Sequence, residues 1–328
     1  MQYLLLIAGF AVIIKSADIL IDSVSKIARA YGVSSFIIGI TVVAFGTSAP
    51  ELAVGVVSGI THTNQLTLGN IIGSSMSNTA LIIGLSALIF PLIVRDSVVK
   101  RELPILIVVQ IALAAMLLHD ARLSRLEGLI LLGAFAVFMI YIVRDAGSSM
   151  KIRIDAEGDI DTDGDGNGLS EQRTKQKRGS IKLWLLSAAS LLGLIIGGKL
   201  TVDSSTQIAQ GLGLSETLIG LTVVAIATTM PELITSIIAA RKKEPDIILG
   251  NCIGSNIFNI LFVLGVSSSI SPIPVTDSLL FDFTAILTVT VLVFVISLLR
   301  KKLRRSVGII LLAGYAAYVA VKIYFALF

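Results

Sequence analysis

The stretch GITVVAFGTSAPE at residues 39–51 returns as GLTVVAIATTMPE at residues 220–232, an offset of 181 residues. A second pair of segments, GNIIGSSMSN at 69–78 and GNCIGSNIFN at 250–259, keeps the same offset. A register that is fixed over two separate motifs indicates an internal duplication, and a duplication of this kind decides the architecture of a chain. The sequence therefore predicts two copies of one structural unit.

The composition around these motifs is that of a membrane protein. Of 328 residues, 55% are apolar and 15% charged, and the mean hydropathy is +0.91. Soluble domains carry about 25% charged residues, because their surfaces face water. We predict an all-α polytopic membrane protein with ten transmembrane helices, near residues 3–22, 33–60, 66–90, 103–118, 126–143, 183–202, 214–240, 247–270, 279–299 and 306–326.

The basic residues predict how these helices are oriented. If the N-terminus lies outside, loops on the inner side hold 21 of the 26 Lys and Arg residues, as the positive-inside rule requires. We therefore expect a multi-pass protein of the cell membrane, with a cytoplasmic linker at residues 144–181. The basic loops indicate membrane orientation and lipid contact, and we expect no nucleic-acid partner.

Each copy of the repeat contains five predicted spans. Residues 1–143 form the first half, with motif region 39–78, and residues 182–328 form the second half, with motif region 220–259. Because five is odd, the second half enters the membrane with the opposite orientation. Inverted repeats are an architecture of secondary transporters, whose site lies near the midplane between the copies.

Two Pro-Glu pairs lie deep in these apolar spans. A carboxylate at the bilayer centre costs about 2.5–3.5 kcal/mol even on lenient scales, so Glu51 and Glu232 need a partner or a function. Pro50 and Pro231 each lack the N–H that would bond the carbonyl four residues earlier. We therefore predict discontinuous helices, with free carbonyls near Thr47 and Thr228, and these are tolerated in a membrane only where they line a cavity.

The side chains at these breaks predict the kind of ligand. Carboxylates, carbonyls and hydroxyls are hard oxygen ligands, and among the cations that suit them Ca²⁺ accepts six to eight in a flexible geometry. The second motif adds two polar helix faces at i, i+4 and i+8, formed by Asn70, Ser74, Asn78, Asn251, Ser255 and Asn259. Its GxxxG glycines, at 69 and 73 and at 250 and 254, are expected to pack neighbouring helices closely.

The paired motifs GTSAPE with GNIIGSSMSN and ATTMPE with GNCIGSNIFN resemble the two α-repeats of the sodium/calcium exchanger family. The resemblance implies alternating access, transported Ca²⁺ and Na⁺, and no cofactor. It implies that Ca²⁺ is held by Glu51, Glu232, Thr47 and Thr228. It implies Na⁺ ligands at Ala44, Ser48, Ser74, Asn78, Ala225, Thr229, Ser255 and Asn259, together with the two glutamates.

The same resemblance implies a stoichiometry and an ion preference. The usual exchange of three Na⁺ for one Ca²⁺ would move one net charge in each cycle. Potassium-dependent relatives carry an aspartate where Asn259 stands, so this chain is expected to work without K⁺.

Other readings remain open at this point. A proton/calcium antiporter of the same superfamily would use the two glutamates as proton carriers, and a passive cation channel is a more distant alternative. The spans contain no nucleophile–base pair, so we do not expect an enzyme. Inorganic cations and membrane lipid are the expected partners, and the sequence specifies no protein partner.

A separate acidic stretch lies in the predicted linker. Asp161, Asp163 and Asp165 have the spacing of the first ligands of an EF-hand loop, with Gly166 at the sixth position. Gln172 stands where the bidentate glutamate belongs. A solvated acidic linker and a weak regulatory Ca²⁺ site are both compatible with this pattern.

Overall fold

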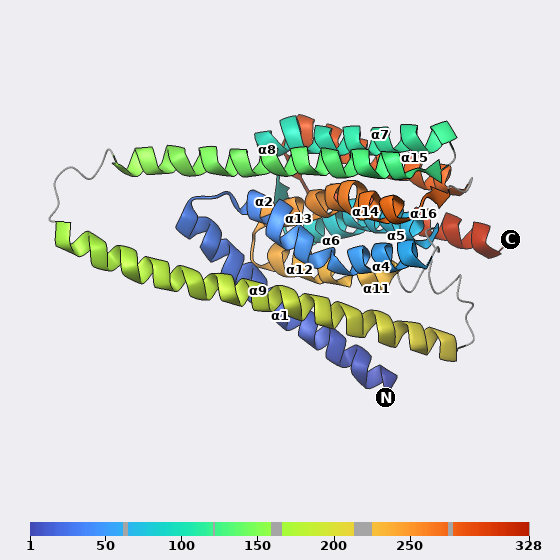
Figure 1. Ribbon diagram of the computed structural model, residues 1–328, viewed down its shortest axis with the longest axis horizontal. Helices are drawn as coiled ribbons and strands as arrows, with labels where there is room; N and C mark the ends of the chain where they lie inside the picture. Colours follow the sequence, from blue (N-terminus) through green and yellow to red (C-terminus); the bar gives the residue numbers. More distant parts are fainter. Residues whose placement is uncertain (62–64, 121, 159–165, 213–224, 275–277, 328) are drawn as a thin grey trace.

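The computed structural model describes residues 1–61, 65–120, 122–158, 166–212, 225–274 and 278–327, and it is a bundle of helices (Figure 1). In these ranges eight helices are long and apolar enough to cross a membrane, and a bent helix pair over residues 35–60 makes a ninth. The predicted span near 214–240 falls partly outside the described residues. The structure confirms a helical membrane protein and leaves the count of ten as a prediction.

The elements of the first half are α1 (Gln2–Tyr31), α2 (Ser35–Ile38), η1 (Gly39–Val43), α3 (Ala44–Thr47), α4 (Ala49–Ile60), α5 (Gln65–Met76), η2 (Ser77–Ile82), α6 (Ile83–Ile89), β1 (Leu92–Ile93), η3 (Val98–Glu102), α7 (Leu103–Asp120), β2 (Arg122–Leu123) and α8 (Arg125–Gly158). Those of the second half are α9 (Gly166–Gly211), α11 (Ala225–Thr228), α12 (Met230–Arg241), α13 (Pro245–Phe258), η5 (Asn259–Val263), α14 (Leu264–Ile270), β3 (Ile273–Pro274), α15 (Ser278–Arg300), β4 (Lys302–Leu303) and α16 (Arg305–Leu327). The η elements are π-helical.

The two halves exchange equivalent contacts. β1 pairs antiparallel with β4, and β2 pairs antiparallel with β3, so each half lends one short strand to each sheet. Helix α6 packs on α16 through Gly84 and Gly308, while α14 packs on α8 through Gly265 and Gly128. This reciprocity is the structural counterpart of the 181-residue offset.

Ion pairs join loops that were predicted to share the cytoplasmic side. Lys301 Nζ lies 2.7 Å from Asp96 Oδ1, and Arg95 pairs with Asp246. On the other predicted side, the Arg125 guanidinium donates to the carbonyl of Ile270 at 3.2 Å. These contacts agree with the predicted grouping of the loops.

The predicted linker is more helical than expected. Helix α8 continues to Gly158 and α9 already begins at Gly166, so both project beyond the bundle (Figure 1). The physical reason is that residues 144–157 and 169–181 contain no proline and are rich in helix formers. Asp161, Asp163 and Asp165 lie outside the described residues, and the division into two halves and a linker stays a prediction.

The centre of the bundle is α13, in which every residue from Ile247 to Phe258 is buried. It can approach α2 and η1 closely because glycine stands at the crossing. A β-carbon at Gly254 would lie 2.6 Å from the carbonyl oxygen of Ile40, and one at Gly250 would lie 2.6 Å from that of Phe36. The predicted packing role of these two glycines is confirmed, and this crossing holds the second motif beside the first. For Gly73 the prediction is wrong, because no atom of the described residues lies within 4 Å of a β-carbon placed there.

On the periphery, α1 packs along α9 and is tied to the end of α12. Lys242 Nζ lies 2.6 Å from Asp18 Oδ1 and 2.8 Å from Asp22 Oδ1. Helices α1 and α9 therefore border the central helices. At the end of α12, ion pairs from Lys242 to two aspartates join α1 to them.

Gly254→Ala should destabilise the fold by about 1–3 kcal/mol, because a methyl group has no room at the backbone crossing. The matched control is Gly133→Ala, where no atom of the described residues lies within 4 Å of the new methyl group. Thermal denaturation in detergent should show a lower apparent Tm for the first variant alone. Equal Tm values for both variants would contradict the close crossing.

Candidate cation site

Both predicted helix breaks are present. The segments Ser35–Thr47 and Ala49–Ile60 meet at an angle of 48°, with Ser48 between them. In the second half, α11 ends at Thr228 and α12 begins at Met230, with Thr229 at the break. Pro50 and Pro231 fall in the first turn of the following helix, where a missing N–H costs no intrahelical bond.

The two glutamates follow these breaks immediately. Glu51 lies in the first turn of α4 and Glu232 in the first turn of α12, and each residue is 1% exposed. The N-terminus of a helix carries partial positive charge, which favours a carboxylate there. The breaks thus place two acidic groups on helix ends inside the bundle.

Hydroxyl groups at the breaks reach across to the other half. Thr47 Oγ1 donates to Asn251 Oδ1 at 3.1 Å, and Thr228 Oγ1 donates to Asn70 Oδ1 at 3.3 Å. These two bonds are equivalent under the 181-residue offset. They show that the polar helix face of each half meets the broken helix of the other.

Ser48 connects the two halves directly at a carboxylate. Its Oγ lies 2.9 Å from Glu232 Oε1 and 2.9 Å from Ser255 Oγ. A second bond between the halves joins their polar helix faces: Asn259 Nδ2 donates to Ser74 Oγ at 3.3 Å. Predicted site residues from both motifs of both halves therefore bond across the two halves in a buried polar network, which is made of several separate hydrogen-bonded groups.

Several oxygen atoms in this network have no hydrogen-bond donor. Among the described residues, the buried acceptors without a partner include both carboxylate oxygens of Glu51, Oε2 of Glu232, and the amide oxygens Oδ1 of Asn78 and Asn259. A buried polar group without a partner costs about 1–3 kcal/mol, and more if it is charged. These five oxygens, three of which belong to the two carboxylates, are ligands that a hard cation would satisfy.

The surroundings also indicate which metals do not fit. Within the described part of the chain, no three or more His, Cys, Asp and Glu side chains gather into a metal-binding group. A site with two carboxylates and neutral oxygens suits Ca²⁺ or Na⁺ and lacks the soft ligands that Zn²⁺ or Cu⁺ prefers.

The remaining predicted ligands differ in how they are placed. The Ala44 carbonyl already accepts from Ser48 N at 3.0 Å and Thr47 Oγ1 at 3.3 Å. Thr229 is buried at the break, and Ala225 begins α11, with its side chain outside the described part. Which residue holds which ion stays a prediction.

Some features of the site were not predicted. The helices that carry Asn78 and Asn259 change to π-helical geometry there, in η2 and η5, and π-helical turns are frequent at functional sites. Asn256 and Thr79 join the network, since Asn256 Nδ2 donates to Thr79 Oγ1 at 2.9 Å. Asn256 carries no distinctive signal in the sequence, because its difference from Ser75 is one of four differences between the two ten-residue motifs.

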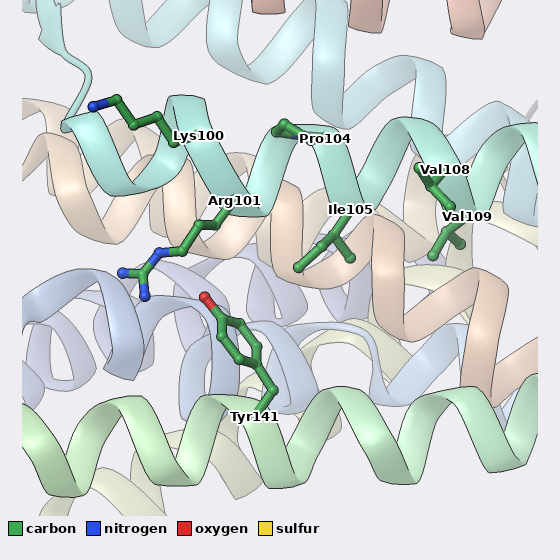
Figure 2. A pocket seen from close by; sticks show the side chains of 7 residues that line it. All are labelled: Lys100, Arg101, Pro104, Ile105, Val108, Val109 and Tyr141. Carbon is green, nitrogen blue, oxygen red and sulfur yellow. The ribbon is translucent and has the colours of Figure 1, made fainter.

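A surface groove lies apart from this network. It has a volume of about 410 Å³ and runs from Lys100 and Arg101 along one side of α7, facing Tyr141 of α8 (Figure 2). None of the predicted ion ligands lines it. The cation site is thus defined by buried atoms and not by this cavity.

The comparisons with known proteins agree with this geometry. Residues 1–144 and 182–324 match the family described as sodium/calcium exchanger protein. The chain belongs to the sodium/calcium exchanger family. The match covers most of both halves and leaves out residues 145–181.

Individual relatives cover nearly the whole chain. Inner membrane protein YrbG of Escherichia coli is 35% identical over 96% of this chain and 95% of its own. Sodium/calcium exchanger MaX1 of Methanosarcina acetivorans is 30% identical over 98% and 99%. The solved structure of the sodium-calcium exchanger NCX_Mj soaked with 10 mM Na⁺ and zero Ca²⁺ superposes with a TM-score of 0.81 at 28% identity, covering 97% of this chain and 98% of that one.

Thermal shift can test the glutamates as ligands without a transport assay. Added Ca²⁺ should raise the apparent Tm of the wild type, because ligand binding stabilises the folded state. We expect this rise to be lost in Glu51→Gln and Glu232→Gln.

The matched control is Glu102→Gln, a buried carboxylate that is 2% exposed and bonded to Tyr141 at 3.2 Å, outside the network. It should keep the full Ca²⁺-dependent rise. If Glu51→Gln also keeps it, Glu51 is not a ligand.

Proposed function

We propose that this protein is a secondary antiporter that exchanges Na⁺ for Ca²⁺ across the cell membrane by alternating access. The observation that carries the proposal is the set of unpartnered oxygens contributed by both halves, centred on Glu51 and Glu232. A site shared by two repeats is accessible from either side when the repeats move relative to each other.

Charge favours calcium as one cargo. Two carboxylates balance one Ca²⁺, and among the described residues no Lys or Arg forms an ion pair with either of them. Mg²⁺ holds its water tightly and demands octahedral geometry, so a dry site with flexible amide and carboxylate oxygens suits Ca²⁺ better.

Neutral oxygens favour sodium as the other cargo. Asn78 and Asn259 each present an unpartnered amide oxygen, which can coordinate Na⁺ but does not accept a proton near neutral pH. A proton-coupled antiporter needs only the carboxylates. The presence of both amides at equivalent positions therefore supports Na⁺ coupling.

Stoichiometry and selectivity follow from the family pattern. Exchange of three Na⁺ for one Ca²⁺ would move one charge per cycle, worth about 2.3 kcal/mol at 100 mV. Asn259 in place of an aspartate supports exchange without K⁺. The distribution of basic loops supports an outside N-terminus and a cytoplasmic segment 144–181.

Uptake of ⁴⁵Ca²⁺ into proteoliposomes tests the coupling ion. Vesicles loaded with Na⁺ and diluted into Na⁺-free buffer should accumulate Ca²⁺, whereas vesicles with an outward proton gradient alone should not. Accumulation driven only by protons would support the proton antiporter, and downhill Ca²⁺ flux without either gradient would indicate a channel.

The same vesicles test charge movement and potassium. Uptake of one Ca²⁺ for three Na⁺ carries one net positive charge outward in each cycle, so an inside-positive potential should accelerate Na⁺-driven Ca²⁺ uptake and an inside-negative potential should slow it. Replacing all K⁺ by choline at a clamped potential should leave the rate unchanged. A rate that ignores the potential would rule out 3:1 exchange, and a requirement for K⁺ would contradict the role given to Asn259.

A further inference from the structure

Asn256 lies one residue after the predicted ligand Ser255, on the buried helix α13, and is 1% exposed. Its side chain has a partner at each end. Oδ1 accepts from Asn78 Nδ2 at 3.0 Å, and Nδ2 donates to Thr79 Oγ1 at 2.9 Å. Asn256 therefore spans two neighbouring residues of the other half, at the start of η2.

These bonds fix the orientation of the Asn78 amide. A primary amide has a donor branch and an acceptor branch, and rotation by about 180° exchanges them at little intrinsic cost. With Nδ2 of Asn78 bound to Asn256, its Oδ1 is on the opposite branch, buried and without a donor. A flip would present the NH₂ group to the cation in place of the oxygen.

Thr79 decides which way Asn256 itself is turned. The Thr79 hydroxyl donates to the carbonyl of Ser75 at 2.9 Å, so toward Asn256 it offers a lone pair. Nδ2 of Asn256 must then face Thr79, and its Oδ1 must face Asn78. Donation therefore runs in one direction along this chain of hydrogen bonds. Asn78 donates to Asn256, Asn256 donates to Thr79, and Thr79 donates to the carbonyl of Ser75.

The other half has no such arrangement. Under the 181-residue offset, Asn256 corresponds to Ser75 and Thr79 corresponds to Ile260, and neither residue can reproduce the two bonds. The equivalent amide, Asn259, donates instead to Ser74 Oγ at 3.3 Å. The Ser74 hydroxyl donates to the carbonyl of Ile71 at 3.1 Å, so it too offers a lone pair, and Asn259 is held directly by a hydroxyl without an intervening amide.

We propose that Thr79 and Asn256 are a positioning pair that holds the Asn78 amide with its oxygen turned to the cation site. This inference rests on the proposed function. It assigns a role to two residues that touch no ion, in the manner of outer-shell groups that orient metal ligands.

The sharpest variant is Thr79→Val, which keeps the shape of the side chain and removes the acceptor of Asn256 Nδ2. Asn256 and then Asn78 become free to flip. The half-saturating internal Na⁺ concentration for Na⁺-driven Ca²⁺ uptake should rise about tenfold, the lower end of the effect of losing an outer-shell partner. Thr79→Ser keeps the hydroxyl and should stay within about twofold of the wild type.

Asn256→Ser introduces the residue found at the equivalent position of the first half, Ser75. This variant should show a loss of apparent affinity similar to that of Thr79→Val. Both variants should retain the wild-type apparent Tm measured without Ca²⁺ to within a few degrees. If Thr79→Val does not fold, Asn256→Ser decides the question alone.

The results separate this inference from the function on which it rests. If the wild type shows no Na⁺-driven Ca²⁺ uptake, the proposed function fails. If the wild type transports and both Thr79→Val and Asn256→Ser keep its half-saturating Na⁺ concentration, the positioning pair is wrong. Equal losses in Thr79→Val and Thr79→Ser would likewise overturn it, because the hydroxyl would then have no part in the effect.

Discussion

The structure depends on burying two carboxylates in a membrane without a basic residue to neutralise them. Glu51 and Glu232 are each 1% exposed, and three of their four oxygens accept no hydrogen bond from the described residues. The bilayer makes such groups costly, so the surrounding sequence has to reduce the cost of burying them. The helix breaks place both groups in first helical turns, and the hydroxyl of Ser48 donates to Glu232.

The duplication explains why the site lies where the halves meet. Neither half offers enough oxygens by itself, because each broken helix finds its polar partner in the opposite motif, as in the bonds Thr47–Asn251 and Thr228–Asn70. The glycines of α13 make this exchange possible by allowing backbone contact with η1. Yet the symmetry is incomplete at Asn78 and Asn259, whose amides are held by different partners.

Much of this could be predicted from the sequence, because its evidence is local or repeated. The Pro-Glu pairs fix where the helices break, and the i, i+4, i+8 spacing fixes which residues share a face with Asn78. The partners of Asn78 could not be predicted in this way, since the contact with Asn256 does not follow the 181-residue offset. The helical structure of residues 144–158 and 166–181, within the predicted linker, was not predicted, because the charged residues there suggested a loop although no proline interrupts them.

The number of Ca²⁺ ions bound by each chain tests most directly whether the two halves form a single site. Equilibrium dialysis with ⁴⁵Ca²⁺ on the purified protein in Na⁺-free detergent solution, at saturating Ca²⁺, gives this number. A shared site with two glutamates predicts one membrane-embedded Ca²⁺ per chain in a variant with Asp161, Asp163 and Asp165 changed to Asn. The shared site would be contradicted if that variant bound two Ca²⁺ ions and still bound one after either glutamate was replaced by Gln. That result would show that each half binds Ca²⁺ independently.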